Sequence, residues 1–153
     1  MNIRNVYVRQ HKRVYSLAML YLQNVSDAED TVQNIFMKYM EKEVTFNDES
    51  HEDAWFITVT RNYCKDQLRN FWKRKVDVGE IPERAMQETE EGELLEIVLT
   101  LPPKYKEVIY LYYYEEYSVR EISNILGRNE STIQTQLAAA RKKMKKLLEK
   151  EGK

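Results

Sequence analysis

The chain has 153 residues, of which 32% are charged and 42% are hydrophobic, and its formal net charge is −1. This composition is typical of a soluble globular protein, and no apolar run approaches the roughly 20 residues of a membrane span. Cys64 is the only cysteine and the two histidines lack metal-ligand spacing, so we expect no disulfide, no metal site and no cofactor. Glycine (4) and proline (3) are scarce and no alternating β-branched run stands out, which predicts an all-α fold.

The first half of the chain is predicted to form three helices. An apolar face from Val14 to Leu22 marks the first helix, and a capping box of Ser26 and Glu29 is expected to start the second. Asp30, Gln33 and Met37 form one row on the exposed face of this second helix. Its expected buried stripe consists of Ala28, Val32, Ile35, Phe36, Tyr39 and Met40.

A polar loop is expected at residues 43–50, with a single exposed aromatic residue, Phe46. A long helix follows from His51 to about Lys75, and its apolar residues form two stripes. A helix that is apolar on two sides packs in a bundle or keeps some aromatic rings for a partner. Between the stripes runs a polar, basic row: Thr58, Asn62, Lys65, Arg69 and Lys73.

The small net charge hides an uneven distribution. Residues 1–76 carry a net charge of +2, residues 77–101 carry −7, and residues 102–153 carry +4. The acidic stretch 77–92 has few large apolar residues and contains the helix breakers Gly79, Pro82 and Gly92. We therefore predict a flexible acidic linker at residues 77–92 that joins two small helical domains, residues 1–76 and 93–153.

The second domain is predicted to form a four-helix unit that ends in a helical hairpin from Ser118 to Lys146. Pro102 and Pro103 restart a helix before the hairpin. Ser118 and Glu121 fit a capping box, and Gly127 suits a left-handed helix end. The expected core residues before the hairpin are Val108, Ile109, Leu111 and Tyr112; the second helix, after Asn129, has the apolar stripe Ile133, Leu137, Ala140, Met144 and Leu147.

A short capped helix, a glycine turn and a longer helix with a basic end are typical of helix-turn-helix DNA binding. Many helical hairpins share this periodicity without binding DNA, so the outward face of the second helix is the discriminating feature. Small and hydrogen-bonding side chains suit a major groove, and cations further along suit phosphates. That face carries Ser131, Thr135, Ala138 and Lys142, flanked by Gln134 and Arg141.

Three segments resemble conserved regions of one family, in the same order. These are SDAEDTVQNIF, WFITVTRNYCKDQLR and the stretch from LPPKYKEVIYLYYYEEY through the hairpin. They resemble regions two and four of sigma factors, and the chain is similar in size and layout to the extracytoplasmic-function (ECF) group of the sigma-70 family. The resemblance covers nearly the whole chain. It implies a non-enzymatic transcription initiation factor that recognises and opens the −10 promoter element with a region 2 bundle and reads the −35 element with region 4.

The resemblance also implies partners and site residues. The partners are the RNA polymerase core, through its β′ clamp helices and β flap, promoter DNA and an anti-sigma factor, with no small-molecule substrate. The implied polymerase-binding residues are Asp27, Asp30, Gln33, Asn34 and Met37. The implied −10 residues are Phe46, Asn47, Trp55, Thr58, Asn62, Lys65, Arg69 and Lys73. The implied −35 residues are Arg128, Ser131, Thr132, Gln134, Thr135, Gln136, Arg141 and Lys142.

This chain departs from the family in one respect. Members usually carry Lys or Arg at the positions that match Gln134, Gln136 and Ala139, whereas this chain is uncharged at all three. Each lost phosphate contact weakens DNA binding and lowers its salt slope by roughly 0.9. We therefore expect modest −35 affinity, with Arg128, Arg141, Lys142 and Lys145 supplying what charge there is.

Two alternatives stay open at this point. The chain could be a helix-turn-helix regulator that acts independently of the polymerase core, with N-terminal helices that sense a ligand or dimerise. It could also be a metal-dependent enzyme that uses Asp27, Glu29 and Asp30, although helix capping and the helix dipole already explain carboxylates at a helix start. The N-terminus carries charges and no small-residue cleavage site, so a signal peptide is not expected. The resemblance to sigma factors implies a bacterial cytoplasmic protein that is not inserted in a membrane.

Overall fold

The computed structural model of the chain describes residues 3–78 and 96–151, with side chains at 3–70 and 96–150. Within these ranges the protein is all-α and contains no strand, as predicted. The chain divides into two compact units, Met1–Ala85 and Met86–Lys153. Residues 79–92 of the predicted linker lie outside the described residues.

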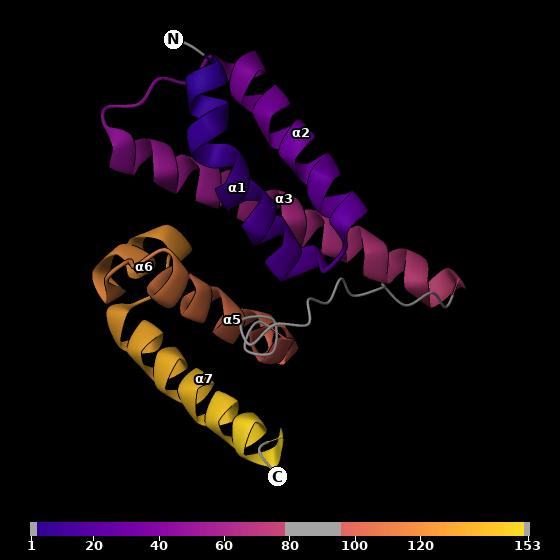
Figure 1. Ribbon diagram of the computed structural model, residues 1–153, viewed down its shortest axis with the longest axis vertical. Helices are drawn as coiled ribbons and strands as arrows, with labels where there is room; N and C mark the ends of the chain where they lie inside the picture. The colour runs from indigo at the N-terminus through magenta and orange to yellow at the C-terminus, as the bar shows by residue number, and fades with distance from the viewer. Residues whose placement is uncertain (1–2, 79–95, 152–153) are drawn as a thin grey trace. The chain divides into compact units, whose positions relative to one another are not determined.

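The first unit contains three helices, α1 (Ile3–Leu22), α2 (Val25–Lys42) and α3 (Glu49–Val78). Helix α1 packs against both α2 and α3 (Figure 1). It begins well before the apolar face that predicted it, and the additional turns bury Val6 and Gln10. The first unit is therefore a three-helix bundle with α1 in contact with both other helices.

Helix α2 starts two residues earlier than its predicted Ser26 cap would place it. Its N-cap is Asn24, whose side-chain oxygen accepts the backbone N–H of Asp27 at 2.9 Å. Helix α1 ends at Leu22, and the next residue, Gln23, has a φ of 53°. This left-handed turn brings Asn24 into capping position, so the Ser26–Glu29 capping box is a wrong prediction.

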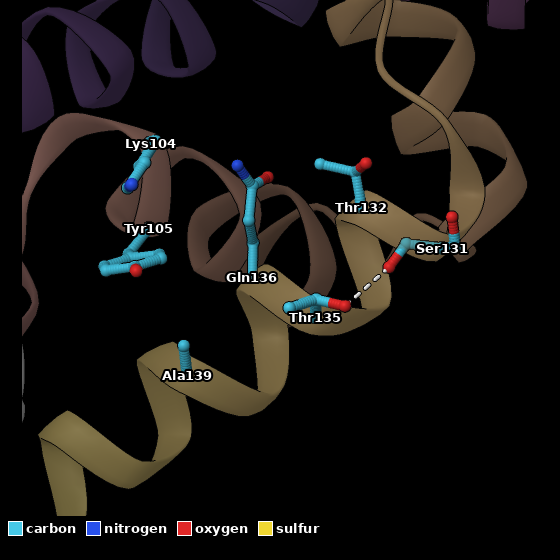
Figure 2. A pocket seen from close by; sticks show the side chains of 7 residues that line it. All are labelled: Lys104, Tyr105, Ser131, Thr132, Thr135, Gln136 and Ala139. Carbon is cyan, nitrogen blue, oxygen red and sulfur yellow. Dashed lines mark hydrogen bonds between the residues drawn. The ribbon is translucent and has the colours of Figure 1, made fainter.

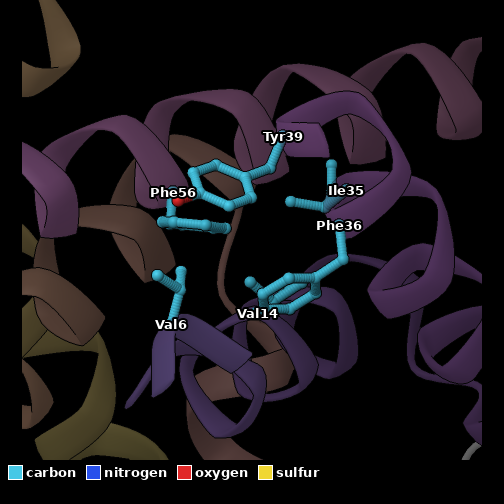
Figure 3. Close-up of a cluster of buried hydrophobic side chains, with 6 residues drawn as sticks. All are labelled: Val6, Val14, Ile35, Phe36, Tyr39 and Phe56. Atoms are coloured by element: carbon cyan, nitrogen blue, oxygen red, sulfur yellow. The ribbon is translucent and has the colours of Figure 1, made fainter. Parts of the chain in front are cut away.

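The core of the first unit is formed by apolar side chains from all three helices, and Figure 3 shows six of them in one cluster. Phe36 is buried there as predicted. Met40, which was also expected in the buried stripe, is 53% exposed, so that part of the prediction is wrong. Phe46 is half-buried and packs against this cluster, so the expectation of an exposed ring is wrong. The cluster consists of Val6, Val14, Ile35, Phe36, Tyr39 and Phe56.

A polar network that the sequence did not predict joins α1 to the start of α3. The Glu52 side chain is only 7% exposed and accepts hydrogen bonds from Arg9 Nη2 at 2.7 Å and Arg9 Nε at 3.0 Å. Gln10 Nε2 donates to the same carboxylate at 2.8 Å, and Arg13 pairs with Asp53 at 2.9 Å. A buried carboxylate needs such partners, so this network fixes where α3 begins against α1.

The second unit contains α5 (Pro103–Ile109), a π-helical segment η1 (Tyr110–Tyr114), α6 (Val119–Leu126) and α7 (Glu130–Glu151), preceded by a helical stretch at residues 96–100. The predicted Ser118–Glu121 capping box is present in both directions, at 3.0 and 3.1 Å. Gly127 ends α6 with a φ of 68°, as its position predicted. Helix α7 packs against α5 and α6 through Ile133, Leu137 and Ala140, which completes the helix-turn-helix.

The π-helical turn was not predicted. Its tyrosine run begins with the buried Tyr110 and continues through the half-buried Tyr112 to the exposed Tyr113 and Tyr114. Such turns are rare, and periodicity at 3.6 residues cannot signal them.

We expect the Glu52→Gln substitution to lower the free energy of unfolding of the first unit by about 1–3 kcal/mol at pH 7. Hydrogen bonds from Arg9 hold the pKa of the Glu52 carboxyl below its ordinary value of 4.5. The wild-type advantage is therefore complete above pH 4.5 and is lost as the pH falls through the lowered pKa. Both tryptophans of the chain lie in α3, so urea unfolding followed by tryptophan fluorescence reports on this unit.

A matched control is Asp66→Asn. Asp66, like Glu52, pairs with an arginine, but both it and its partner Arg69 are exposed. That exposed pair contributes less than about 1 kcal/mol, and its loss should change stability little. Equal stability of Glu52→Gln and the wild type at pH 7 would contradict the role given to the network.

Candidate nucleic-acid and protein interfaces

The predicted protein-binding residues lie together on the solvent side of α2. Asp27, Asp30, Gln33 and Asn34 are exposed, and Met37 is 53% exposed. Asn34 Nδ2 donates to the backbone oxygen of Asp30 at 2.8 Å, one turn earlier. An exposed methionine beside carboxylates and amides is an adaptable surface for a protein partner.

Met40, one turn beyond Met37, is also 53% exposed and was assigned to the core from the sequence. Its apolar side chain suggested a buried position, but the packing of α2 against α1 and α3 leaves it exposed. The apolar part of the α2 surface is therefore larger than predicted.

The predicted loop residues are held in place by packing and capping. The Phe46 ring is stacked on Tyr39 with 6.1 Å between ring centroids and meets Trp55 edge-on at 5.9 Å. The His51 backbone N–H donates to Asp48 Oδ1 at 2.8 Å, and the Asn47 N–H donates to His51 Nδ1 at 3.2 Å. Asn47 remains exposed, so this ordered loop offers a polar side chain beside an aromatic cluster.

The polar row of α3 continues from this loop along the helix. Asn62 and Arg69 are exposed, Thr58 and Lys65 are half-buried, and the Lys73 side chain lies outside those described. Arg69 pairs with the exposed carboxylate of Asp66. Exposed ion pairs are weak, so this arginine can exchange its partner for a phosphate at little cost.

The outward face of α7 is polar and mostly uncharged. Ser131, Thr132, Gln134 and Thr135 are exposed in its first turns, and Thr135 Oγ1 donates to the Ser131 backbone oxygen at 2.9 Å. Lys142 is exposed further along the helix. The helix therefore presents hydroxyl and amide groups where base edges would lie.

Arg128 is engaged within the protein, although the sequence suggested a phosphate contact. Its side chain is 20% exposed, and Nη2 lies 2.6 Å from Oε2 of Glu107, whose side chain is only 1% exposed. Its Nη1 donates to Gln136 Oε1 at 2.9 Å and to the Lys104 backbone oxygen at 3.3 Å. Arg128 and Gln136, both predicted to bind DNA, thus bind each other and join the turn to α5 and α7.

Arg141 is also held by neighbouring side chains. Its Nε donates to the Tyr113 hydroxyl at 2.7 Å, and its guanidinium lies 5.5 Å from the Tyr112 ring centroid. The hydrogen bond that Arg141 donates to Tyr113 raises the pKa of Arg141. The π-helical tyrosines therefore orient this cation, a role that the sequence did not predict.

A pocket of about 330 Å³ opens between the start of α5 and the outward face of α7 (Figure 2). Lys104 and Tyr105 of α5 line one side of this pocket, and no sequence motif pointed to either residue. Its lining residues are Lys104, Tyr105, Ser131, Thr132, Thr135, Gln136 and Ala139.

Neither a candidate metal site nor a membrane-spanning helix is found in the described part of the chain. Within residues 3–78 and 96–151, no cluster of three or more His, Cys, Asp or Glu side chains could hold a metal ion. No helix in the same ranges is long and apolar enough to cross a membrane.

Comparisons with known proteins match both units. The family model for sigma-70 region 2 matches residues 6–74, and the model for sigma-70 region 4 matches residues 91–144. RNA polymerase sigma factor SigV of Bacillus subtilis is 32% identical over 149 residues, covering 94% of this chain and 90% of that protein. ECF RNA polymerase sigma factor SigM of the same organism is 28% identical over 158 residues, covering 96% of this chain and 95% of that protein.

Solved structures share the fold. The sigma factor RpoE of Bartonella quintana, solved in complex with the anti-sigma factor NepR, has a TM-score of 0.83 at 22% identity and covers 95% of this chain and 96% of its own. CnrH, in complex with the cytosolic domain of CnrY, has a TM-score of 0.71 at 20% identity and covers 96% of this chain and 87% of its own.

We expect the Arg128→Ala substitution to destabilise the second unit by about 3–5 kcal/mol, because it leaves the buried Glu107 carboxylate without its cation. Arg128→Lys should recover only part of this loss, since an ammonium cannot reproduce the forked contacts. Hydrogen–deuterium exchange of peptides from α5, α6 and α7 measures the change. Lys142→Ala, which removes an exposed cation from α7, is the control, and equal exchange in Arg128→Ala and this control would contradict the expectation.

Proposed function

Because the chain belongs to the sigma-70 family of RNA polymerase sigma factors, in its ECF group, it is a transcription initiation factor that directs the polymerase to promoters, and we propose how its two units divide that work. The first unit binds the polymerase core and opens the −10 element, and the second reads the −35 element. The observation that carries this proposal is the match of regions 2 and 4, in order, to the two compact units. We propose that the factor has no catalytic chemistry of its own and acts in the bacterial cytoplasm.

The exposed face of α2 is our proposed contact with the β′ clamp helices of the core. Its carboxylates and amides supply directional contacts, and Met37 supplies apolar area that adapts to a partner. Met40 extends this area, so we include it in the proposed contact.

The loop before α3 and the polar row along α3 are our proposed −10 interface. Single-stranded bases are held by stacking and by cationic contacts to the backbone, and this region carries an aromatic cluster at the start of α3 and Asn62, Lys65 and Arg69 further along the helix. Phe46 and Trp55 are half-buried in the aromatic cluster, which favours a base that docks on the edge of the cluster near Asn47. Lys73 is the proposed last contact of the row.

The outward face of α7 is our proposed −35 reader, through Ser131, Thr132, Gln134 and Thr135. Arg128 and Gln136 instead act as positioning residues, because they are bonded to each other and to α5. Arg141 and Lys142 remain the proposed phosphate contacts on α7. Helix α7 carries no lysine or arginine before Arg141, so its first turns bind duplex DNA weakly by themselves, but linkage to the first unit raises the effective concentration at the promoter.

We propose two further partners, the β flap of the polymerase core and an anti-sigma factor. The structural neighbour RpoE was solved bound to an anti-sigma factor, and such a partner would act by covering the polymerase-binding faces. No motif in the sequence points to a sensory ligand, so an external partner is the simplest source of control.

Run-off transcription with purified core polymerase on fragments of the host genome tests the function. We expect transcripts that start at defined sites and require both the chain and the core. The alternative, a helix-turn-helix regulator that works without the core, predicts tight binding to paired half-sites by the chain alone. That result, together with the absence of specific initiation and of core binding, would overturn the proposal.

The substitution Asp30→Ala should weaken binding to the polymerase core by about tenfold, because it removes a carboxylate from the centre of the proposed contact. Glu29→Ala is the matched control, since Glu29 is an equally exposed neighbour that lies off the Asp30–Gln33–Met37 row. Fluorescence anisotropy of labelled chain titrated with core polymerase measures both variants. Equal losses in the two variants would argue against the α2 face.

A further inference from the structure

The pocket beside α7 combines features that suit an anion. Lys104 Nζ lies 5.1 Å from the Tyr105 ring centroid, and Lys143 Nζ lies 5.9 Å from the same centroid. Tyr105 therefore has two ammonium groups near its ring at the edge of the pocket. None of the seven lining residues is acidic, and Ser131 and Thr132 supply hydroxyl donors.

The walls of the pocket are fixed relative to each other. Arg128 donates to the Lys104 backbone oxygen at 3.3 Å on the α5 side and to Gln136 Oε1 at 2.9 Å on the α7 side. The buried Glu107 holds the same guanidinium at 2.6 Å. The width of the pocket is thus set by an internal network before any ligand arrives, which reduces the entropy that binding would cost.

The place of the pocket selects among anions. It opens on the face of α7 that carries Ser131, Thr132 and Thr135, next to the proposed base-reading side chains (Figure 2). Ala139 forms part of its floor, and its methyl group leaves open the space that a longer side chain would fill. An anion bound here would lie directly beside a DNA major groove occupied by α7.

We propose that this pocket receives one backbone phosphate of the −35 element, with Lys104 and Lys143 neutralising it. This inference rests on the proposed function and adds α5 to the DNA-binding surface. It supplies two cationic contacts to a recognition helix that is uncharged at Gln134, Gln136 and Ala139.

The test asks whether the loss of a lysine from the protein and the neutralisation of one DNA phosphate have coupled effects on binding. Full-length chain is assembled with core polymerase on a promoter fragment recovered by run-off transcription, and each −35 phosphate in turn is replaced by a neutral methylphosphonate. We expect one phosphate whose neutralisation weakens wild-type binding roughly three- to tenfold, an effect that is clearly smaller in Lys104→Ala. Lys104→Ala should also lower the slope of log affinity against log salt by about 0.9, and Lys104→Arg should restore it.

Lys150→Ala, which removes an exposed lysine from the last turn of α7, is the control and should leave the coupled phosphate unchanged. If every phosphate affects the wild type and Lys104→Ala equally, the inference is overturned while the sigma-factor function stands. Competition by inorganic phosphate at constant ionic strength, without coupling to any methylphosphonate, would assign the pocket to a free anion and also overturn it. Failure of the wild type to initiate on the unmodified fragment would overturn the function and this inference together.

Discussion

The geometry of the second unit depends on one buried carboxylate. Glu107 is almost completely excluded from water, and a charged group in that position is tolerated only when a cation and further hydrogen bonds accompany it. Arg128 meets this requirement from the turn of the helix-turn-helix, and its remaining N–H groups bind α5 and α7. The first unit uses the same device, since Glu52 gathers Arg9 and Gln10 to join α1 and α3. In each unit a buried carboxylate joins helices through charged hydrogen bonds that apolar packing cannot supply.

The sequence predicted the features that are encoded locally and missed those that depend on distant residues. The Ser118–Glu121 box and the Gly127 helix end were predicted correctly, because each involves residues within one turn. The Arg128–Glu107 and Arg9–Glu52 pairs join residues 21 and 43 positions apart, and no spacing rule connects them. Apolar periodicity assigned Met40 to the core and the polar surroundings of Phe46 assigned it to the surface, and packing reversed both. The exposure of the polar row on α2 was predicted correctly because the row has a helical period, whereas the α5 residues that line the pocket belong to no motif.

The distribution of arginines explains the character of the DNA-facing surface. Two of the cations expected to meet phosphates, Arg128 and Arg141, are occupied by Glu107 and by the π-helical tyrosines. Their interactions stabilise the unit and orient one cation, and the exposed side chains in the first turns of α7 are mainly hydroxyls and amides. Under the proposed function, weak DNA contact by the second unit is tolerated because the first unit would bind the same polymerase–promoter complex. The two compact units and the lack of cations in the first turns of α7 both fit that proposal.

The bond between Arg128 and Gln136 also limits how promoter preference can diverge. A substitution at Gln136 would remove one hydrogen bond from the guanidinium that neutralises Glu107. A change of side chain that altered DNA binding at this position would therefore also destabilise the second unit. Ser131, Thr132 and Gln134 make no such contact with Glu107 or Arg128, and they can vary while the unit remains folded. Paralogues descended from this chain would thus acquire new target sites through the first turns of α7 and inherit Gln136 unchanged.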